Sequence, residues 1–137
     1  MRIFVNANVL FSAAKSDGAV RRLLVLLQQA GHQCVVDAYV VEEARRNIVA
    51  KAPAASAYLA ELVAGLEHAR RLLPADPVLD AILPLPPKDR PVLSAAIRQR
   101  CAALVTGDRS HFGALFDTSV HGVAIHSPRS LAELLLS

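Results

Sequence analysis

Short apolar runs rich in β-branched residues alternate along this chain with longer segments of helical periodicity. Four such runs, at residues 2–5, 33–36, 102–105 and 123–125, predict strands. Because helical segments separate these strands, the strands are expected to run parallel, with helices covering both faces of the sheet. The alternation therefore predicts an α/β protein with three layers, α/β/α, and a central parallel sheet.

The helix signals fall between the predicted strands. Apolar residues recur at helical spacing from Val20 until Gly31, after Asp37, after Pro53, after Asp89 and after Ser127. A shorter helix is expected near residues 110–116. By contrast, residues 6–8 are predicted to form a polar loop after the first strand. Residues 73–88 contain five prolines and are predicted to be largely loop, with a short extended piece around Val78.

The chain length and composition favour one globular domain over residues 1–137. Hydrophobic residues make up 53% of the 137 residues and charged residues 20%, and neither an internal repeat nor a linker is evident. The apolar stretches are shorter than the roughly 20 residues of a membrane helix, and the start does not resemble a secretory signal. We therefore expect a cytoplasmic protein that does not enter a membrane.

Charge and cysteine content restrict the possible ligands and cross-links only slightly. The net charge is +3, and twelve of the fifteen cationic residues are arginine, the side chain best suited to pair with phosphate. This permits nucleic-acid binding, although charge alone favours an Arg-rich solvated surface. Cys34 and Cys101 lack a CxxC or Cys/His pattern, so buried thiols are expected rather than a zinc site or a disulfide.

Four polar residues are predicted to meet at one edge of the sheet. Asn6 follows the first predicted strand and Asp108 follows the third, and ligands of parallel sheets bind beyond such carboxyl ends. Asp89 begins the helix before the third strand, and Glu43 lies one turn into the helix after the second. Mg²⁺ and Mn²⁺ prefer oxygen ligands, so this set suits a metal site for phosphodiester hydrolysis.

Each of these residues also has a simpler local role. Asp89 can be a helix N-cap, and Asp108 can be a turn residue or a cap. Glu43 can be a solvated surface charge, and Asn6 can be a turn former. The residues are therefore informative only in combination.

Four segments of the chain resemble the PIN-domain ribonucleases, especially the VapC-like toxins of bacterial toxin–antitoxin pairs. Residues 3–10 (IFVNANVL) resemble the opening strand of that family, in which an Asp stands where this chain has Asn6. Residues 40–44 (VVEEA) resemble the segment with the second acid, and residues 89–96 (DRPVLSAA) the segment with the third. Residues 104–112 (LVTGDRSHF) resemble the segment with the fourth acid. The resemblance extends over nearly the whole chain.

The resemblance implies a Mg²⁺ or Mn²⁺ site that activates water for attack on an RNA phosphodiester. Glu43, Asp89 and Asp108 would hold the metal directly or through water, and Glu43 fits the second position better than Glu42. Thr106 would either orient a water or a carboxylate there or be an ordinary strand-end residue. The resemblance also implies an RNA substrate, a small antitoxin partner and a homodimer.

Other polar residues lie beside the predicted ligands. Lys88, Arg90 and Arg109 are candidates to contact RNA phosphates, although a surface role suits each of them as well. His111 is expected to be structural, because packing next to Phe112 requires no chemistry of it.

The departure from the family pattern is at Asn6. An amide oxygen can contact a cation but carries no charge, so Asn in place of Asp is expected to weaken metal binding and water activation. We therefore expect the activity of this chain to be impaired. Natural decay and an inactivating substitution are both open as origins, and the three retained acids favour the substitution.

Other functional classes fit the sequence less well. The main alternative is a catalytically inactive PIN-fold module that binds RNA or a protein partner. A phosphatase with a strand-end DxD motif would need Asp at both position 6 and position 8, where this chain has Asn. A dinucleotide-binding enzyme would need a GxGxxG motif after the first strand, and the chain has none there.

Overall fold

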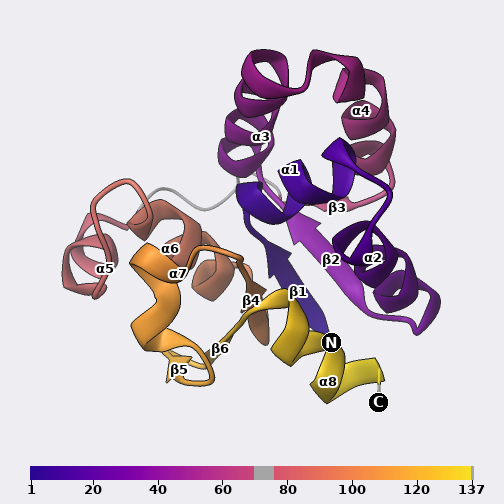
Figure 1. Ribbon diagram of the computed structural model, residues 1–137. Coiled ribbons are helices and arrows are strands. Elements are labelled where there is room, and N and C mark those ends of the chain that lie inside the picture. Colours follow the sequence, from indigo (N-terminus) through magenta and orange to yellow (C-terminus); the bar gives the residue numbers. More distant parts are fainter. Residues whose placement is uncertain (70–75, 137) are drawn as a thin grey trace.

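The computed structural model describes residues 1–69 and 76–136 (Figure 1). The strands are β1 (Arg2–Val5), β2 (Gln33–Val36), β3 (Glu67–His68), β4 (Ala103–Val105), β5 (Ser119–Val120) and β6 (Val123–His126). The helices are α1 (Ala7–Lys15), α2 (Ala19–Gln29), α3 (Ala38–Lys51), α4 (Ser56–Ala64), α5 (Pro77–Ile82), α6 (Arg90–Arg98), α7 (Arg109–Phe112) and α8 (Pro128–Leu136). Two 3₁₀ turns, η1 (Pro53–Ala55) and η2 (Gly113–Leu115), complete the described elements.

The strands form one sheet in the order β3-β2-β1-β4-β6-β5. The pairings from β3 across to β6 are parallel, and β5 joins β6 as a short antiparallel edge strand. From β1 the chain moves outward through β2 to β3, and it then returns to β4 on the other side of β1. Since such crossovers are right-handed, the two directions place their helices on opposite faces of the sheet.

Figure 1 shows the two helix groups on opposite sides of the strands, with α1 to α4 on one side and α5 to α7 on the other. The last helix, α8, returns to pack against α2. The predicted α/β/α fold class is thus confirmed, and the antiparallel β5 is the departure from a purely parallel sheet. Both faces of the sheet are covered, which explains why Ile3, Phe4 and Val5 are all fully buried.

The predicted polar loop at residues 6–8 is wrong, because α1 begins at Ala7. Asn6 is its N-cap residue and has an extended backbone, with φ −72° and ψ 158°. Val9, Leu10 and Ala13 are buried along the helix face that packs on the core. Their helical spacing outweighed the turn propensity of the two asparagines.

The proline-rich segment also contains a helix that the sequence analysis missed. Pro77 occupies the first turn of α5, where a missing N–H costs nothing, and Asp76 Oδ1 accepts a hydrogen bond from Leu79 N at 3.0 Å. The extended piece expected around Val78 is therefore wrong. Residues 83–88 contain neither helix nor strand, as predicted for the loop, and residues 73–75 of the expected loop lie outside the described residues.

Two further expectations concern the cysteines and the membrane. Cys34 and Cys101 are both buried, and burial raises the pKa of each thiol to about 11, so both stay protonated at neutral pH. In residues 1–69 and 76–136, no helix has the length and apolar character required to cross a bilayer.

The N-cap of α3 yields a prediction about stability. Asp37 Oδ1 accepts a hydrogen bond from Val40 N at 3.0 Å, yet burial raises the pKa of Asp37 above its ordinary value of 3.8. Because the folded pKa is the higher one, stability should fall as pH rises from about 3.8 through the folded pKa. Asp37→Asn keeps a good cap without the charge, so it should be at least as stable as the parent at pH 7 and lose this pH dependence.

Urea unfolding at pH 4 and pH 7 measures this effect. Asp37→Ala is the matched control, because it removes the charge and the cap together and should cost about 1 kcal/mol. The explanation would be contradicted if Asp37→Asn destabilised the protein at pH 7 as much as Asp37→Ala does.

Candidate metal centre

The chain leaves β1 toward one edge of the sheet and leaves β4 toward the other, so the winding of the fold reverses between these two strands. A cavity opens at their carboxyl ends. They are paired in parallel, and Asn6 N donates a hydrogen bond to Val105 O at 3.1 Å just beyond the paired residues. Ligands bind at such a switch point because the two crossovers leave it in opposite directions. The cavity has a volume of about 430 Å³ and is lined by Asn6, Asn8, Val9, Ser12, Val20, Glu43, Asn47, Lys88, Asp89, Gly107, Asp108 and Pro128.

Thr106 joins the two strand ends beneath this cavity. Its side chain is fully buried, and Oγ1 accepts hydrogen bonds from Asn6 Nδ2 at 3.1 Å, Asn8 Nδ2 at 3.0 Å and the backbone N of Asp108 at 3.2 Å. Asn8 Oδ1 in turn accepts a hydrogen bond from Gly107 N at 2.8 Å. The end of β1, the first turn of α1 and the loop after β4 are therefore held together by one hydroxyl group.

The side chain of Asn6 is engaged at both of its polar atoms. It is only 4% exposed, its Oδ1 accepts from Ala7 N at 2.8 Å, and its Nδ2 donates to Thr106 Oγ1. Asp at this position would have no donor, so the hydroxyl of Thr106 would have to donate to the carboxylate instead. The amide thus fits the structure well while bringing no charge to the cavity.

Asp89 occupies the N-cap position of α6 without acting as a cap. Its side chain forms no capping hydrogen bond in the described structure, although the residue is only 8% exposed. Asp108 behaves differently, because its Oδ1 accepts a hydrogen bond from His111 N at 3.0 Å and so caps α7. Asp108 therefore caps a helix through one of its two oxygens, whereas Asp89 does not act as a cap.

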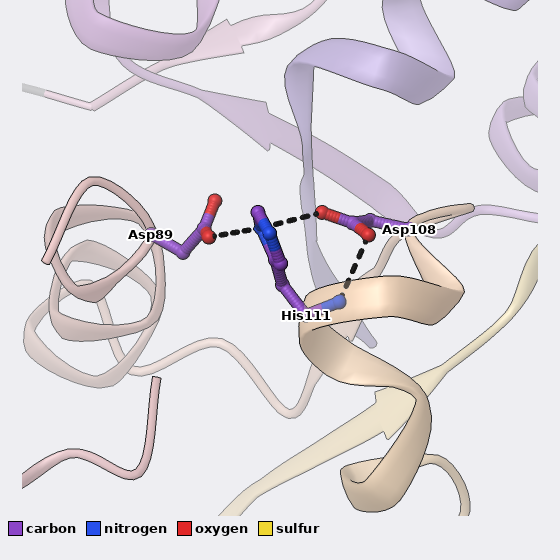
Figure 2. Close-up of side chains that lie close together, drawn as sticks. All are labelled: Asp89, Asp108 and His111. Atoms are coloured by element: carbon purple, nitrogen blue, oxygen red, sulfur yellow. Dashed lines mark hydrogen bonds and ion pairs between the residues drawn. The ribbon is translucent and has the colours of Figure 1, made fainter. Parts of the chain in front are cut away.

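The ring of His111 lies between the carboxylates of Asp89 and Asp108 (Figure 2). Its Nδ1 is 2.7 Å from Asp89 Oδ2 and 3.2 Å from Asp108 Oδ2. Despite this proximity, Nδ1 of His111 and Oδ2 of Asp89 are buried and form no aligned hydrogen bond with the described residues. One atom from each of the three side chains lies within 4.8 Å of the others.

This environment differs from the one that the sequence analysis expected for His111. Phe112 is fully buried in the core, whereas His111 is half-buried and faces the carboxylates. The ring of His111 thus contacts the two carboxylates and does not share the core environment of Phe112. The missed signal is the spacing of three residues from Asp108, which places both side chains on the same side of one turn.

The structure separates the two adjacent glutamates of α3. Glu43 lines the cavity, whereas Glu42 is exposed and accepts hydrogen bonds from Arg45 Nε at 2.9 Å and Nη2 at 2.6 Å. The hydrogen bond from Arg45 lowers the pKa of Glu42. Glu43 is thus the member of the pair that lies on the same cavity as Asp89 and Asp108, as expected.

The pKa of Tyr39 is affected by burial and by the negative charges on this side of the cavity. Its hydroxyl donates to Lys88 O at 2.7 Å. Burial, followed by the negative charges of Glu43 and Asp89, raises the pKa of Tyr39 above its ordinary value of 10.0. Two of the predicted ligands, one from α3 and one from the start of α6, therefore act on the same side chain.

The polar groups around the cavity fit a divalent cation. Glu43, Asp89 and Asp108 supply carboxylate oxygens, and hard cations bind such oxygens together with water. The buried Oδ2 of Asp89 has the ring nitrogen of His111 as a polar neighbour but no aligned hydrogen bond, so a cation or water at this position would stabilise the carboxylate.

Other cationic and amide residues lie around the cavity and differ in whether their side chains are free to meet a ligand. Lys88 lines the cavity and is exposed, and Arg109 is also exposed, whereas Arg90 Nε is bound to Leu85 O at 2.8 Å. Asn8 and Asn47 line the cavity but were not predicted as site residues. Asn47 lies one helical turn after Glu43, a spacing that could have indicated it.

The hydroxyl of Thr106 yields the second prediction. Thr106→Val keeps the shape but leaves the buried amide group of Asn6 and the half-buried amide group of Asn8 without their acceptor, which should cost about 1–3 kcal/mol in unfolding free energy. Thr118→Val is the matched control, because Thr118 is exposed and its hydroxyl donates one hydrogen bond to Leu115 O. Chemical denaturation that shows equal losses for the two variants would refute the central role of Thr106.

Comparison with known proteins adds a family and a fold. The family model of the PIN domain matches residues 2–110. Among solved structures, the chain is similar to VapBC2 from Rickettsia felis bound to a DNA fragment from their promoter, with a TM-score of 0.65 and 15% sequence identity. That alignment covers 93% of this chain and 98% of the other, and at this identity it supports the fold alone. No curated protein sequence matches the chain significantly.

Proposed function

The chain belongs to the PIN-domain family, and on this premise we propose that it is a Mg²⁺- or Mn²⁺-dependent ribonuclease whose activity is impaired by Asn6. The observation that carries the proposal is the placement of Glu43, Asp89 and Asp108 around one cavity at the switch point of the sheet. These side chains come from three separate parts of the chain. A purely local role for each of them would not bring all three to one cavity.

The retained carboxylates define how the site would work. Asp89 and Asp108 would hold the metal, and Glu43 would bind it directly or through a water molecule. A bound Mg²⁺ or Mn²⁺ lowers the pKa of a coordinated water and offsets charge on the scissile phosphate. Lys88, at the exposed wall of the same cavity, is suited to bind a phosphate of the RNA backbone.

Asn6 affects the charge of this site more than its shape. Asp and Asn are nearly isosteric, and the two atoms of the amide already have partners in Ala7 N and Thr106 Oγ1. The substitution thus leaves three carboxylates where the family pattern has four acids. With one negative charge fewer, the site should hold a divalent cation less tightly and promote water ionisation less.

We further propose that the protein is the toxin of a toxin–antitoxin pair, that it acts on RNA in the cytoplasm, and that it forms a homodimer held by a small antitoxin. The resemblance to VapC-like toxins and the structural similarity to VapBC2 support this role. A catalytically inactive module that binds RNA or protein remains the alternative, and the full engagement of Asn6 within the protein favours it. Restoring Asp at position 6 separates the two functions.

Asn6→Asp should therefore increase both metal affinity and metal-dependent RNA cleavage. Loss of an outer ligand commonly costs 10- to 100-fold, so restoring a carboxylate next to the metal should give a gain of at least about tenfold in each. Titration calorimetry with Mn²⁺ and a cleavage assay on single-stranded RNA measure these effects. EDTA should abolish the activity that the variant gains.

Asn47→Asp is the matched control, because it adds the same charge to the cavity wall away from the strand end. It should produce a much smaller gain. If Asn6→Asp stays folded and neither binds Mn²⁺ nor cleaves any RNA tested, the binding-module alternative is preferred.

The two glutamates of α3 provide a second test in the Asn6→Asp background. Glu43→Gln removes a carboxylate that lines the cavity, so metal affinity and cleavage should each fall at least about tenfold. Glu42→Gln changes an exposed residue that is paired with Arg45 and should leave both nearly unchanged. The opposite pattern would assign the ligand role to Glu42.

A further inference from the structure

We propose that His111 is itself a metal ligand, so that the cation of this chain lies between Asp89, Asp108 and His111 and the site prefers Mn²⁺, Co²⁺ or Zn²⁺ to Mg²⁺. The inference rests on the proposed function, since it takes Asp89 and Asp108, which line the cavity, to be metal ligands. It goes further by replacing an all-oxygen ligand set with one that contains a nitrogen.

The spacing of the ligand atoms supports this arrangement. Adjacent ligands of an octahedral cation with bonds of about 2.1 Å lie about 3.0 Å apart. The distances from His111 Nδ1 to Asp89 Oδ2 and to Asp108 Oδ2, 2.7 and 3.2 Å, lie on either side of that value. Small side-chain adjustments would therefore bring all three atoms to one cation.

The hydrogen bonding around the cluster points to the same position. Asp89 is 8% exposed, and neither its Oδ2 nor His111 Nδ1 forms an aligned hydrogen bond with the described residues. A cation would accept the lone pairs of both atoms at once. At Asn6, by contrast, both polar side-chain atoms already have hydrogen-bond partners, so the described polar atoms around this cluster that lack an aligned hydrogen bond are those of His111 and Asp89.

The local structure also orients His111 and Asp108 for this role. Asp108 Oδ1 accepts a hydrogen bond from His111 N, which fixes the turn that carries both residues. The other oxygen, Oδ2, faces the ring nitrogen across 3.2 Å and is the one available to a metal (Figure 2). One carboxylate thus both caps the turn and faces the cavity.

Ligand chemistry determines the expected metal preference. Imidazole nitrogen suits Zn²⁺ and similar transition metals, whereas Mg²⁺ favours oxygen ligands and water. A neutral imidazole adds no charge, and the two carboxylates of Asp89 and Asp108 balance a divalent cation by themselves. Binding at this position would therefore depend less on the charge that is missing at Asn6.

The test uses the intact protein with Mn²⁺ and Mg²⁺ as probes. Titration calorimetry should show tighter binding of Mn²⁺ than of Mg²⁺, and pulsed electron paramagnetic resonance of bound Mn²⁺ should show coupling to a histidine nitrogen. His111→Ala should remove that coupling and weaken Mn²⁺ binding at least about tenfold, with a smaller effect on Mg²⁺. His32→Ala, a control at the amino-terminal end of β2, should change neither result.

The coupling is measured on the unsubstituted protein, so the proposal is tested even if His111→Ala fails to fold. Bound Mn²⁺ without nitrogen coupling would overturn the ligand role of His111. If Asp89→Asn then abolished this Mn²⁺ binding, the carboxylate site of the proposed function would still be supported. If neither the parent nor Asn6→Asp binds Mn²⁺, the proposed function fails together with this inference.

Discussion

The cavity depends on the hydrogen bonds that Thr106 accepts at the junction of β1 and β4. The chain leaves β1 and β4 in opposite directions, and beyond the backbone hydrogen bond from Asn6 N to Val105 O the two segments are connected by side chains. Here one buried hydroxyl accepts from Asn6, Asn8 and the backbone of Asp108, so the walls of the cavity keep a fixed spacing. The proposed ligands can converge because this junction determines where α1 begins and where the loop after β4 turns.

The sequence was most informative for the strands that helices cover on both faces, because such strands accept almost only apolar residues. The runs at β1, β2, β4 and β6 are apolar because helices cover both faces of the sheet, and their order along the chain was enough to predict the α/β/α architecture. The edge strands β3 and β5 were missed because each has two residues, too few to show any periodicity. Helices α1 and α5 were missed because asparagines and prolines at a helix start resemble a loop when their caps are not considered.

The site was only partly predictable for a related reason. The strand ends predicted that Asn6 and Asp108 lie together, and the family resemblance favoured Glu43 over Glu42. In the structure Glu43 lines the cavity and Glu42 is paired with Arg45. The His111 ring lies next to Asp89 at the start of α6, and these two residues are brought together only by the tertiary fold. Asn8 was missed because residues 6–8 were predicted to form a loop, whereas Asn8 lies in the first turn of α1 and contacts Gly107.

At position 6, Asn and Asp serve the fold equally well but differ in the charge that they bring to the site. Asn and Asp are equally good N-cap residues, and the Oδ1 that accepts from Ala7 N is present in both. The start of α1 therefore does not distinguish them, whereas a cation distinguishes them by a full unit of charge. A substitution here can change the charge of the site with little disturbance of the core, because Asn and Asp are nearly isosteric. The hydroxyl of Thr106, which can accept from an amide or donate to a carboxylate, allows the same backbone to hold both residues.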